Sequence, residues 1–254
     1  MLNLESIKKD LEELLKQVGK SVKEGYESKN KEFVGKLDAN DMLTKYDTET
    51  NAKILEHLEK NYPDISIISE EADEISKDSE YVFVVDPIDG TRNFVRNIPV
   101  FYIGIALVKN NETLLCLTYN PITEELFWAI KGEGAYKNEM RLKVSDRTIK
   151  LSDLYIRTIP DKKLEKEIVC KIIETAHQVK NEMCCHYEIS GVAYSRGDGF
   201  ISKNSSPWDY CHYLLVEEAG GKVTDWKGEK FDISKNNIIA SNGVIHEDLL
   251  KMVK

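Results

Sequence analysis

The sequence predicts a fold of the α/β (α+β) class, and three patterns lead to this expectation. Apolar residues recur at helical spacing between Lys and Glu across residues 3–27, which predicts one long amphipathic helix. Runs of β-branched and aromatic residues then follow one another, with turns such as Asn110-Asn111 between them, as in an antiparallel sheet. Beyond residue 150, strand and helix patterns alternate again. Helices packed on sheets account for this order, whereas a simple βαβ repeat does not.

In the first half, the second helix includes Ile54 and Leu58 and ends before Asn61-Tyr62-Pro63, because a residue that precedes proline avoids the helical conformation. The polar residues 28–40 before this helix are expected to form a loop or irregular strands. The stretch KGEGAYKNE holds a lone G-x-G with no helix pattern behind it, so it predicts a hairpin rather than a dinucleotide site. The expected strands are residues 65–69, 81–85, 101–108, 113–119 and 125–130.

In the second half, a further helix is expected to begin at Ser206, with Pro207 at its first position and Asp209 at its third, and to end at Gly220-Gly221. The other expected elements are a strand at residues 154–159, an amphipathic helix at 164–179 and short elements at 184–189 and 192–201. The change of pattern indicates a domain boundary between residues 140 and 152. We therefore expect two halves, residues 1–145 and 146–254.

The composition limits the classes of function. The chain has 254 residues, enough for a large core, and a formal net charge of -9 with no block of consecutive basic residues. This charge argues against nucleic acid or an anionic membrane as a main partner. An anionic substrate would then need local positive charge, which a bound metal ion can supply.

The cysteines and the chain start indicate a compartment. Five cysteines form an odd set with no C-x-x-C pair, so neither a zinc site nor a disulfide framework is expected, and a reducing compartment is the simpler interpretation. Met1 is followed by a charged amphipathic segment, and no apolar run approaches the length of a membrane span. We expect a cytoplasmic protein.

The stretch YVFVVDPIDGTRNF, residues 81–94, carries the chemistry. Asp86 follows a buried strand directly, so we expect Asp86 and Asp89 on the loop at its carboxyl end, where α/β sheets bind ligands. Pro87 and Gly90 allow a tight turn that aims both carboxylates at one point. Such a pair repels unless a cation lies between its members, and Mg²⁺ prefers oxygen ligands of this kind. An Asx-type turn, with Asp86 capping the next segment, is the alternative from these residues alone.

The same stretch resembles a known family signature. DPIDGTRNF resembles that of the inositol monophosphatase family, the lithium-sensitive, Mg²⁺-dependent phosphatases related to fructose-1,6-bisphosphatase. The pair Glu70-Glu71 in IISEEADE resembles the family's acidic pair, and WDYCHYLLVEEAGG, residues 208–221, resembles its second signature. Residues 36–47 and 238–242 extend the resemblance over nearly the whole chain. It implies a layered αβαβα sandwich and a homodimer, with the stripe of the first helix or the strand edge after Val100 as candidate interfaces.

The resemblance implies two or three Mg²⁺ ions. Glu70, Asp86 and the main-chain carbonyl of Ile88 would hold one ion, and Asp86, Asp89 and Asp209 would hold a second. A weaker third ion would lie near Glu70. From the residues alone, EEADE is a solvated acidic loop and Asp209 is a helix-capping residue, a role compatible with binding a metal.

The resemblance also implies roles in catalysis and substrate binding. Thr91, supported by Asp47, would orient the attacking water together with Glu70. The main-chain N–H groups of Gly90 and Thr91 would receive phosphate oxygens if they open a helix. From its position alone, Asp47 is an acidic residue in the first turn of a helix.

The implied activity is hydrolysis of a small phosphorylated metabolite, of the inositol monophosphate or sugar phosphate type, by metal-activated water. This chain departs from the family at the position seven before Asp209, which is Ser202 rather than an acid. The candidate substrate contacts are Asp89, Gly90, Thr91, Ser202 and Asp209. Alternatively, Arg92, Arg196 and Lys203 meet a second phosphate, as in fructose 1,6-bisphosphate or 3'-phosphoadenosine 5'-phosphate, or are solvated surface cations.

Two other functions remain as alternatives. Phosphatases of the haloacid dehalogenase type carry D-x-D-x-T, with a nucleophilic first Asp and an acid two residues later. Here the two aspartates are three residues apart, which moves the acid relative to the nucleophile. The second alternative is a non-catalytic module that binds metal or a phosphorylated metabolite.

Overall fold

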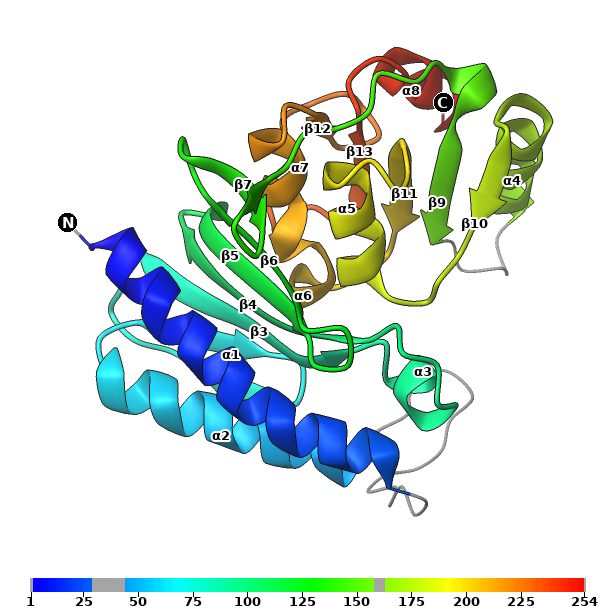
Figure 1. Ribbon diagram of the computed structural model, residues 1–254. Helices are drawn as coiled ribbons and strands as arrows, with labels where there is room; N and C mark the ends of the chain where they lie inside the picture. Colours follow the sequence, from blue (N-terminus) through cyan, green and yellow to red (C-terminus); the bar gives the residue numbers. More distant parts are fainter. Residues whose placement is uncertain (1, 29–43, 158–162, 254) are drawn as a thin grey trace.

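The computed structural model describes residues 2–28, 44–157 and 163–253 and confirms the predicted fold class. Two sheets and three sets of helices stack as five layers in the order αβαβα (Figure 1). The first sheet is built from residues 66–141 and the second from residues 153–241.

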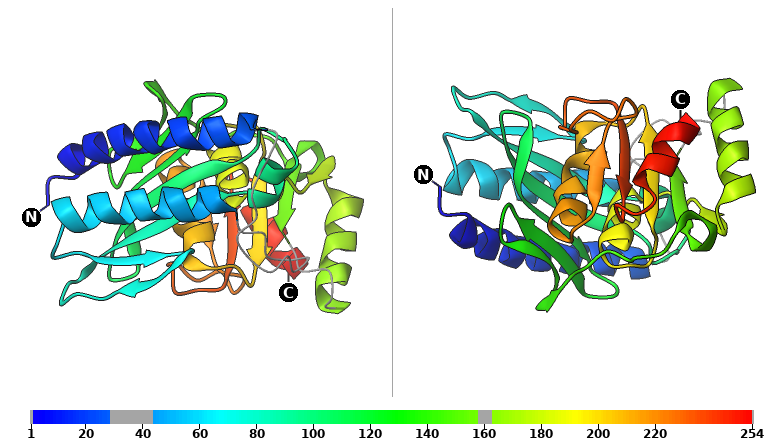
Figure 2. Two further views of the ribbon diagram at one scale, coloured as in Figure 1. Left: turned by 90° about the horizontal axis from the view of Figure 1, so that it is seen from below. Right: turned by 90° about the horizontal axis from the view of Figure 1, so that it is seen from above.

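The first outer layer consists of α1 (Leu4–Glu27) and α2 (Lys45–Asn61), which lie side by side on one face of the eight-stranded sheet (Figure 2). The sheet has the order β2-β1-β3-β4-β5-β6-β7-β8, with β1 and β3 parallel and all other neighbours antiparallel. Its strands are β1 (Ser66–Ser69), β2 (Ala72–Ile75), β3 (Tyr81–Asp89), β4 (Tyr102–Lys109), β5 (Glu112–Asn120), β6 (Glu125–Ile130), β7 (Gly134–Lys137) and β8 (Met140–Arg141). The short helix α3 (Thr91–Val95) follows β3 directly.

A central helical layer separates the two sheets. It contains α5 (Cys185–Ala193), α6 (Pro207–Tyr210), the 3-10 turn η2 (Cys211–Tyr213) and α7 (Leu214–Glu218). The second sheet has the order β10-β9-β11-β13-β12 and is covered on its outer face by α4 (Lys163–Thr175) and α8 (His246–Val253). Its strands are β9 (Asp153–Arg157), β10 (Gln178–Lys180), β11 (Gly199–Lys203), β12 (Lys222–Thr224) and β13 (Asn237–Ser241), and the 3-10 turn η1 (Ile149–Leu151) precedes them.

Three apolar clusters join these layers. The first lies between α1, α2 and the first sheet, the second between the two sheets, and the third under α4 and α8. The second cluster draws side chains from both predicted halves, including Val84 and Phe200. The division of the chain into two domains at residue 145 remains a prediction.

The structure corrects several predicted elements. The helix expected at residues 164–179 ends at Thr175, and β10 follows it. Segments 184–189 and 192–201 belong to α5 and β11. The single helix expected after Ser206 is divided into α6, η2 and α7, and β2 and α8 were not predicted. Residues 29–43, with most of the predicted loop and of the 36–47 segment, lie outside the described residues, as do residues 158 and 159.

Both predicted subunit interfaces are used within the chain itself. The apolar stripe of α1, with Leu11, Leu15 and Val22, is buried against the first sheet. The strand after Val100 is β4, which pairs with β3 on one side and β5 on the other and so has no free edge. Of the helices in the described part of the chain, none has the length and apolar character needed to cross a membrane.

Candidate metal centre

A β-bulge in β3 brings Asp86 and Asp89 to one face of the first sheet. Asp86 lies opposite Gly104 of β4 and Asp89 opposite Tyr102, so β3 has one residue more than β4 between these pairs. The extra residue interrupts the alternation of side chains, which would otherwise put residues three apart on opposite faces. Accordingly, Ile88 packs with the cluster under α1 and α2, as Val85 does. The two aspartates lie within the strand, not on a loop beyond Val85 as the sequence indicated.

Glu70 is placed beside Asp86 by the parallel pairing of β1 and β3. Ser69 is the partner of Val85, and the Glu70 N–H donates to the Val85 carbonyl over 3.2 Å. The next residue on each strand is therefore an acid, and the two carboxyl groups share a hydrogen bond. Glu71 is half-buried and contributes a further negative charge nearby.

Asp209 reaches this edge from the second half of the chain. Its carboxylate caps α6 by accepting from the Ser206 N–H over 2.8 Å, and the Ser206 side chain accepts in turn from the Asp209 N–H, which confirms the predicted capping box. α6 packs against β3. The charge of Asp209 accordingly raises the pKa values of Glu70 and Asp86.

The electrostatics of these acids fit a bound divalent cation. Asp86 is almost fully buried, and burial followed by the charges of Glu70, Asp89 and Asp209 raises its pKa well above the ordinary range. Its Oδ1 has no hydrogen-bond partner among the described residues. The protein packed around the Glu70 carboxyl raises its pKa to about 8, and neighbouring charges add to the rise. Glu70 as a whole is exposed to solvent, which weakens the effect of burial and leaves repulsion among the acids as the main cause. A cation between the acids would compensate this repulsion.

Thr91 and Asp47 lie together, as the sequence led us to expect. The Thr91 hydroxyl is 3.1 Å from Asp47 Oδ1 and 2.9 Å from the carbonyl oxygen of Ile88, either of which accepts its proton. Asp47 also closes a capping box with Thr44 at the start of α2. Burial raises the pKa of Asp47 to about 6, while these hydrogen bonds oppose the rise.

Gly90 joins β3 to α3 in a conformation that favours glycine. Its φ is 90°, in the left-handed region, and a Cβ there would lie 2.9 Å from the Val100 carbonyl oxygen. Its own carbonyl accepts from the N–H groups of Asn93 and Phe94 and so starts α3. The Gly90 and Thr91 N–H groups are thus at the start of a helix, where the sequence predicted a phosphate contact.

Asp89 is held by the start of α5, which the sequence did not predict. Its Oδ2 accepts from the main-chain N–H of His186 over 2.6 Å and lies 3.1 Å from the Cys184 thiol. Burial and the Asp89 charge raise the pKa of this thiol well above its ordinary value, so it stays protonated and can donate.

A fully buried triplet, His186, Cys211 and His212, lies directly behind these acids. One possible metal-ligating atom of each lies within 4.8 Å of the other two, and no other such triplet occurs in the described parts of the chain, the acidic residues included. Each ring has a carbonyl partner: His186 Nε2 is 2.9 Å from the Trp208 oxygen, and His212 Nε2 is 2.8 Å from the Leu117 oxygen. Since a carbonyl only accepts, both Nε2 atoms carry the proton.

The other ring nitrogens also have partners, Thr118 Oγ1 for His186 and the Cys211 thiol for His212, each at 3.2 Å. Burial lowers the pKa of His212 well below its ordinary value. Both rings and the Cys211 thiol of the triplet therefore already have hydrogen-bond partners within the chain. Its sequence signal was the polar pair Cys211-His212 within an apolar helix pattern.

Three of the predicted contacts to substrate outside the acidic cluster already have partners within the chain. Ser202 is fully buried, and its hydroxyl accepts from the Tyr210 hydroxyl over 2.9 Å. Arg196 forms a salt bridge with Glu125 at 2.6 Å, and Lys203 lies over the Trp226 ring, 5.0 Å from its centroid. Arg92 follows Thr91 in α3. Of these residues, only Arg92 adjoins the acidic cluster in sequence.

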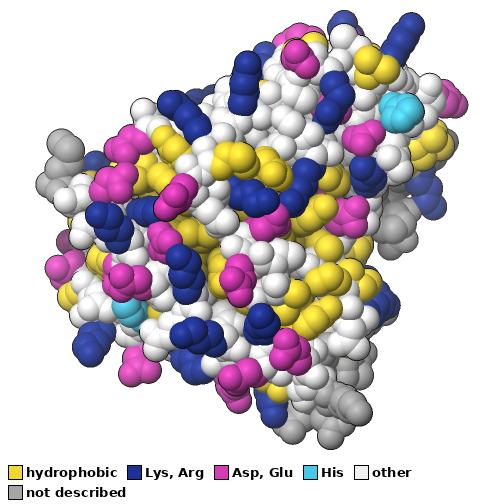
Figure 3. Space-filling view, viewed as in Figure 1, with side chains coloured by type: hydrophobic (Ala, Val, Ile, Leu, Met, Phe, Trp, Pro, Cys, Tyr) yellow, Lys and Arg dark blue, Asp and Glu magenta, His cyan; other side chains and the backbone are white. Residues whose placement is uncertain are grey.

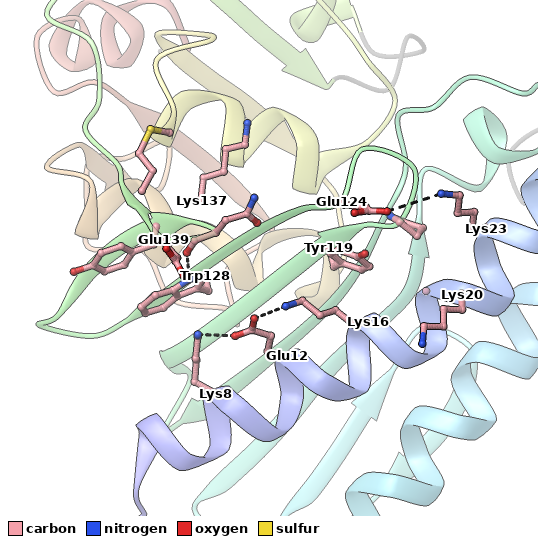
Figure 4. A pocket seen from close by; sticks show the side chains of 15 residues that line it. Lys8, Glu12, Lys16, Lys20, Lys23, Tyr119, Glu124, Trp128, Lys137 and Glu139 are labelled. Carbon is pink, nitrogen blue, oxygen red and sulfur yellow. Dashed lines mark hydrogen bonds and ion pairs between the residues drawn. The ribbon is translucent and has the colours of Figure 1, made fainter.

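A groove of about 1230 Å³ lies between α1 and the β5–β7 strands, and its lining includes none of the four acids Glu70, Asp86, Asp89 and Asp209. Four of its five lysines are paired with glutamates, and of these Lys8 and Lys16 each lie 2.6 Å from Glu12 (Figure 4). Trp128 stacks on Tyr136 at 4.3 Å. On the face shown in Figure 3, basic and acidic side chains are likewise interspersed. The candidate site is therefore the cluster of the four acids rather than this groove.

Two named proteins are similar to most of this chain. A "Nus factor SuhB" from Haemophilus influenzae is 31% identical over 246 residues, which are 94% of this chain and 92% of that protein. A Thermotoga maritima protein named fructose-1,6-bisphosphatase/inositol-1-monophosphatase is 31% identical over 214 residues, 84% of this chain and 82% of the relative.

Solved structures show the same layers. SuhB from Bartonella henselae superposes with a TM-score of 0.91 at 30% identity and covers 98% of both chains. An IMPase/NADP phosphatase complexed with Mg²⁺ and phosphate shares the fold with a TM-score of 0.86 at 22% identity, over 98% of this chain and 95% of that one. The model of the inositol monophosphatase family matches residues 3–254. The chain therefore belongs to the inositol monophosphatase family.

Proposed function

We propose that this chain is a Mg²⁺-dependent phosphomonoesterase that hydrolyses a small phosphorylated metabolite. The observation that carries the proposal is the set of four carboxylates at one edge, with raised pKa values for Glu70 and Asp86 and an unpartnered buried oxygen on Asp86. Such a set is costly without a cation, and hard divalent ions take oxygen ligands. Family membership supports the same activity.

We propose five residues as Mg²⁺ ligands. Glu70, Asp86 and the Ile88 carbonyl would hold one Mg²⁺, and Asp86, Asp89 and Asp209 a second, with a weaker third near Glu70. When bound, these ions supply activation of water and compensation of the charge on the leaving oxygen. Asp86 would contact both ions, which agrees with its central place in the repulsion among the acids.

Thr91 and Asp47 would orient the attacking water. When the Thr91 hydroxyl donates its proton to Asp47 Oδ1 at 3.1 Å, the lone pairs of the hydroxyl oxygen can accept a hydrogen bond from a water. This hydrogen bond orients the water, so that one of the water's own lone pairs points in a fixed direction. Glu70, one residue beyond β1, would accept the second proton of the water. The oxygen would then attack phosphorus as that proton passes to Glu70, and the bond to the alcohol oxygen would break. The departing alkoxide would take a proton from solvent water, and phosphate would leave without a covalent enzyme intermediate.

The Gly90 and Thr91 N–H groups would receive phosphate oxygens at the start of α3. We favour a substrate with one phosphate, because Arg196 is already neutralised by Glu125 and Lys203 is engaged with Trp226. Ser202 is left out of the proposed contacts because its hydroxyl is buried and bonded.

Three further properties belong to the proposal. The five cysteines are free thiols, which supports a reducing, cytoplasmic compartment. A homodimer and sensitivity to lithium are proposed from the family. A staphylococcal inositol monophosphatase has been solved as an inhibitory complex soaked in 100 mM LiCl.

The test is release of inorganic phosphate from inositol monophosphates, sugar monophosphates, fructose 1,6-bisphosphate, nicotinamide dinucleotide phosphate and 3'-phosphoadenosine 5'-phosphate. Each assay is run with and without Mg²⁺, and Asp86→Asn serves as the blank. Release that needs Mg²⁺ and that the blank lacks supports the proposal, and the preferred substrate shows whether one or two phosphates are bound. Equal release by the blank refutes the assignment.

Binding without turnover is the second candidate. The relatives named "Nus factor SuhB" favour it, since that name describes a factor rather than a reaction. Mg²⁺ binding with no phosphate release from any substrate of the panel would select this role.

A further inference from the structure

The metal ligands that we propose come from two halves of the chain, so something must fix Asp89 relative to Asp209. Asp89 ends β3 in the first sheet, and Asp209 begins the α6 turn of the central layer. His186, at the start of α5, contacts both Asp89 and the residue before Asp209, and Cys184 beside it contacts Asp89.

Asp89 is oriented through one of its two oxygens. The His186 N–H at 2.6 Å and the Cys184 thiol at 3.1 Å both reach Oδ2, and the described residues offer Oδ1 no donor. Two donors on one oxygen fix the rotation of the carboxylate and leave the other oxygen for a further ligand.

Asp209 is oriented through the residue before it. The His186 ring donates from Nε2 to the Trp208 carbonyl at 2.9 Å. The same ring accepts from Thr118 Oγ1 at 3.2 Å, which fixes its tautomer and its orientation. His186 thus binds Asp89 with its main chain and the neighbour of Asp209 with its side chain.

Gly104, in the sheet beneath, leaves room for the His186 ring because it has no side chain. Gly104 lies opposite Asp86 on one neighbouring strand and opposite Thr118 on the other. A Cβ at this position would lie 2.2 Å from His186 Cε1 and 2.7 Å from His212 Cε1. The ring of His186 therefore rests on the sheet between the acids and Thr118.

We propose that Cys184 and His186 are positioning residues that set Asp89 and Asp209 at the separation needed to bind the same Mg²⁺ ion. This inference rests on the proposed function. It predicts that substituting either residue weakens Mg²⁺ affinity, but changes turnover much less when Mg²⁺ is saturating.

The experiment measures Mg²⁺ binding to the metal-free protein by calorimetry, independently of activity. Removing the thiol in Cys184→Ala should raise the dissociation constant about three- to tenfold, whereas Cys184→Ser keeps a donor and should stay within about twofold. His186→Ala should raise it more than about tenfold, and saturating Mg²⁺ should restore turnover to within about threefold.

The matched control is His212→Ala. It removes an equivalent buried ring whose polar contacts, to Cys211 and Leu117, include neither Asp89 nor Trp208. Unfolding temperatures of both His variants, measured in chelator, report the loss of packing. We expect similar losses of stability but a much weaker effect of His212→Ala on Mg²⁺ affinity.

Three results would overturn the inference while the proposed function stands: wild-type affinity in His186→Ala, equal weakening in His212→Ala, or no rescue by Cys184→Ser. Absence of Mg²⁺ binding by the wild-type protein would instead refute the proposed function itself.

Discussion

Replacing Asp86 by Asn should have opposite effects on stability without and with Mg²⁺. In the metal-free protein, Asp86 Oδ1 is a buried carboxylate oxygen without a partner, in a group whose pKa is raised by burial and three neighbouring acids. Asn keeps the shape, removes the charge and can donate to Glu70. Relieving one such group should increase the free energy of unfolding by about 1–3 kcal/mol. For a chain of this size, that corresponds to an unfolding temperature about 2–12 °C higher.

With Mg²⁺ the order reverses. Ligand at one hundred times its dissociation constant stabilises the wild-type protein by about 2.7 kcal/mol, and the variant should lack this gain. Turnover should fall by about 10³-fold or more, because a ligand of both ions is lost.

The assay is thermal unfolding of both proteins in chelator and in saturating Mg²⁺, with phosphate release measured alongside. Asp73→Asn, the same change at an exposed position in β2, is the control and should alter neither quantity. A metal-free variant that is less stable than wild type would refute our account of Asp86 as an uncompensated buried acid.

Other consequences can be tested in the same assays. Glu70→Gln should lower turnover by about 10²-fold or more and Glu71→Gln by less than about threefold; the reverse order would show that the acidic pair is assigned one residue out of place. Thr91→Val, which keeps the shape but removes the hydroxyl, should cost about 10²-fold in turnover, while Thr91→Ser should recover most of it; equal losses would exclude a role for the hydroxyl. Because the folded-state pKa of Glu70 is raised to about 8, the metal-free protein binds more protons folded than unfolded between about pH 4.5 and 8. Its unfolding temperature should therefore fall as pH rises through this range, and Mg²⁺ should suppress the fall. Glu70→Gln lacks this proton, so the unfolding temperature of the variant minus that of the wild type should rise with pH, and a difference that stays flat or falls would contradict this account. Gly104→Ala should weaken Mg²⁺ binding measured by calorimetry, since its Cβ displaces the His186 ring; unchanged affinity would show that the ring position is unimportant.

The sequence was informative where local rules decide the outcome. The stripe of α1 follows from helical period alone, and the Ser206 capping box from the chemistry of helix starts. The proximity of Thr91 and Asp47 was expected from the family resemblance, and the structure brings them to 3.1 Å.

Features that depend on pairing between distant segments were not predicted. The bulge in β3 exists only relative to β4, so nothing in residues 81–89 alone reveals it. Likewise, Cys184 and His186 lie in a segment with weak periodicity, and their contact with Asp89 crosses nearly a hundred positions of sequence. The division of the helix after Asp209 is also a tertiary effect, because Cys211 and His212 turn toward β5.

The bulge in β3 makes the length of this segment as important as its composition. Because Asp86 and Asp89 are three residues apart, regular pairing with β4 at this length would carry Asp89 to the side of the sheet occupied by α1 and α2, and the extra residue in the bulge keeps both carboxylates on one side. A conservative exchange of Ile88 would leave that geometry unchanged. In laboratory evolution of this chain, apolar exchanges at Ile88 can therefore be sampled, whereas changes that abolish the bulge at this spacing would move a carboxylate to the other side of the sheet.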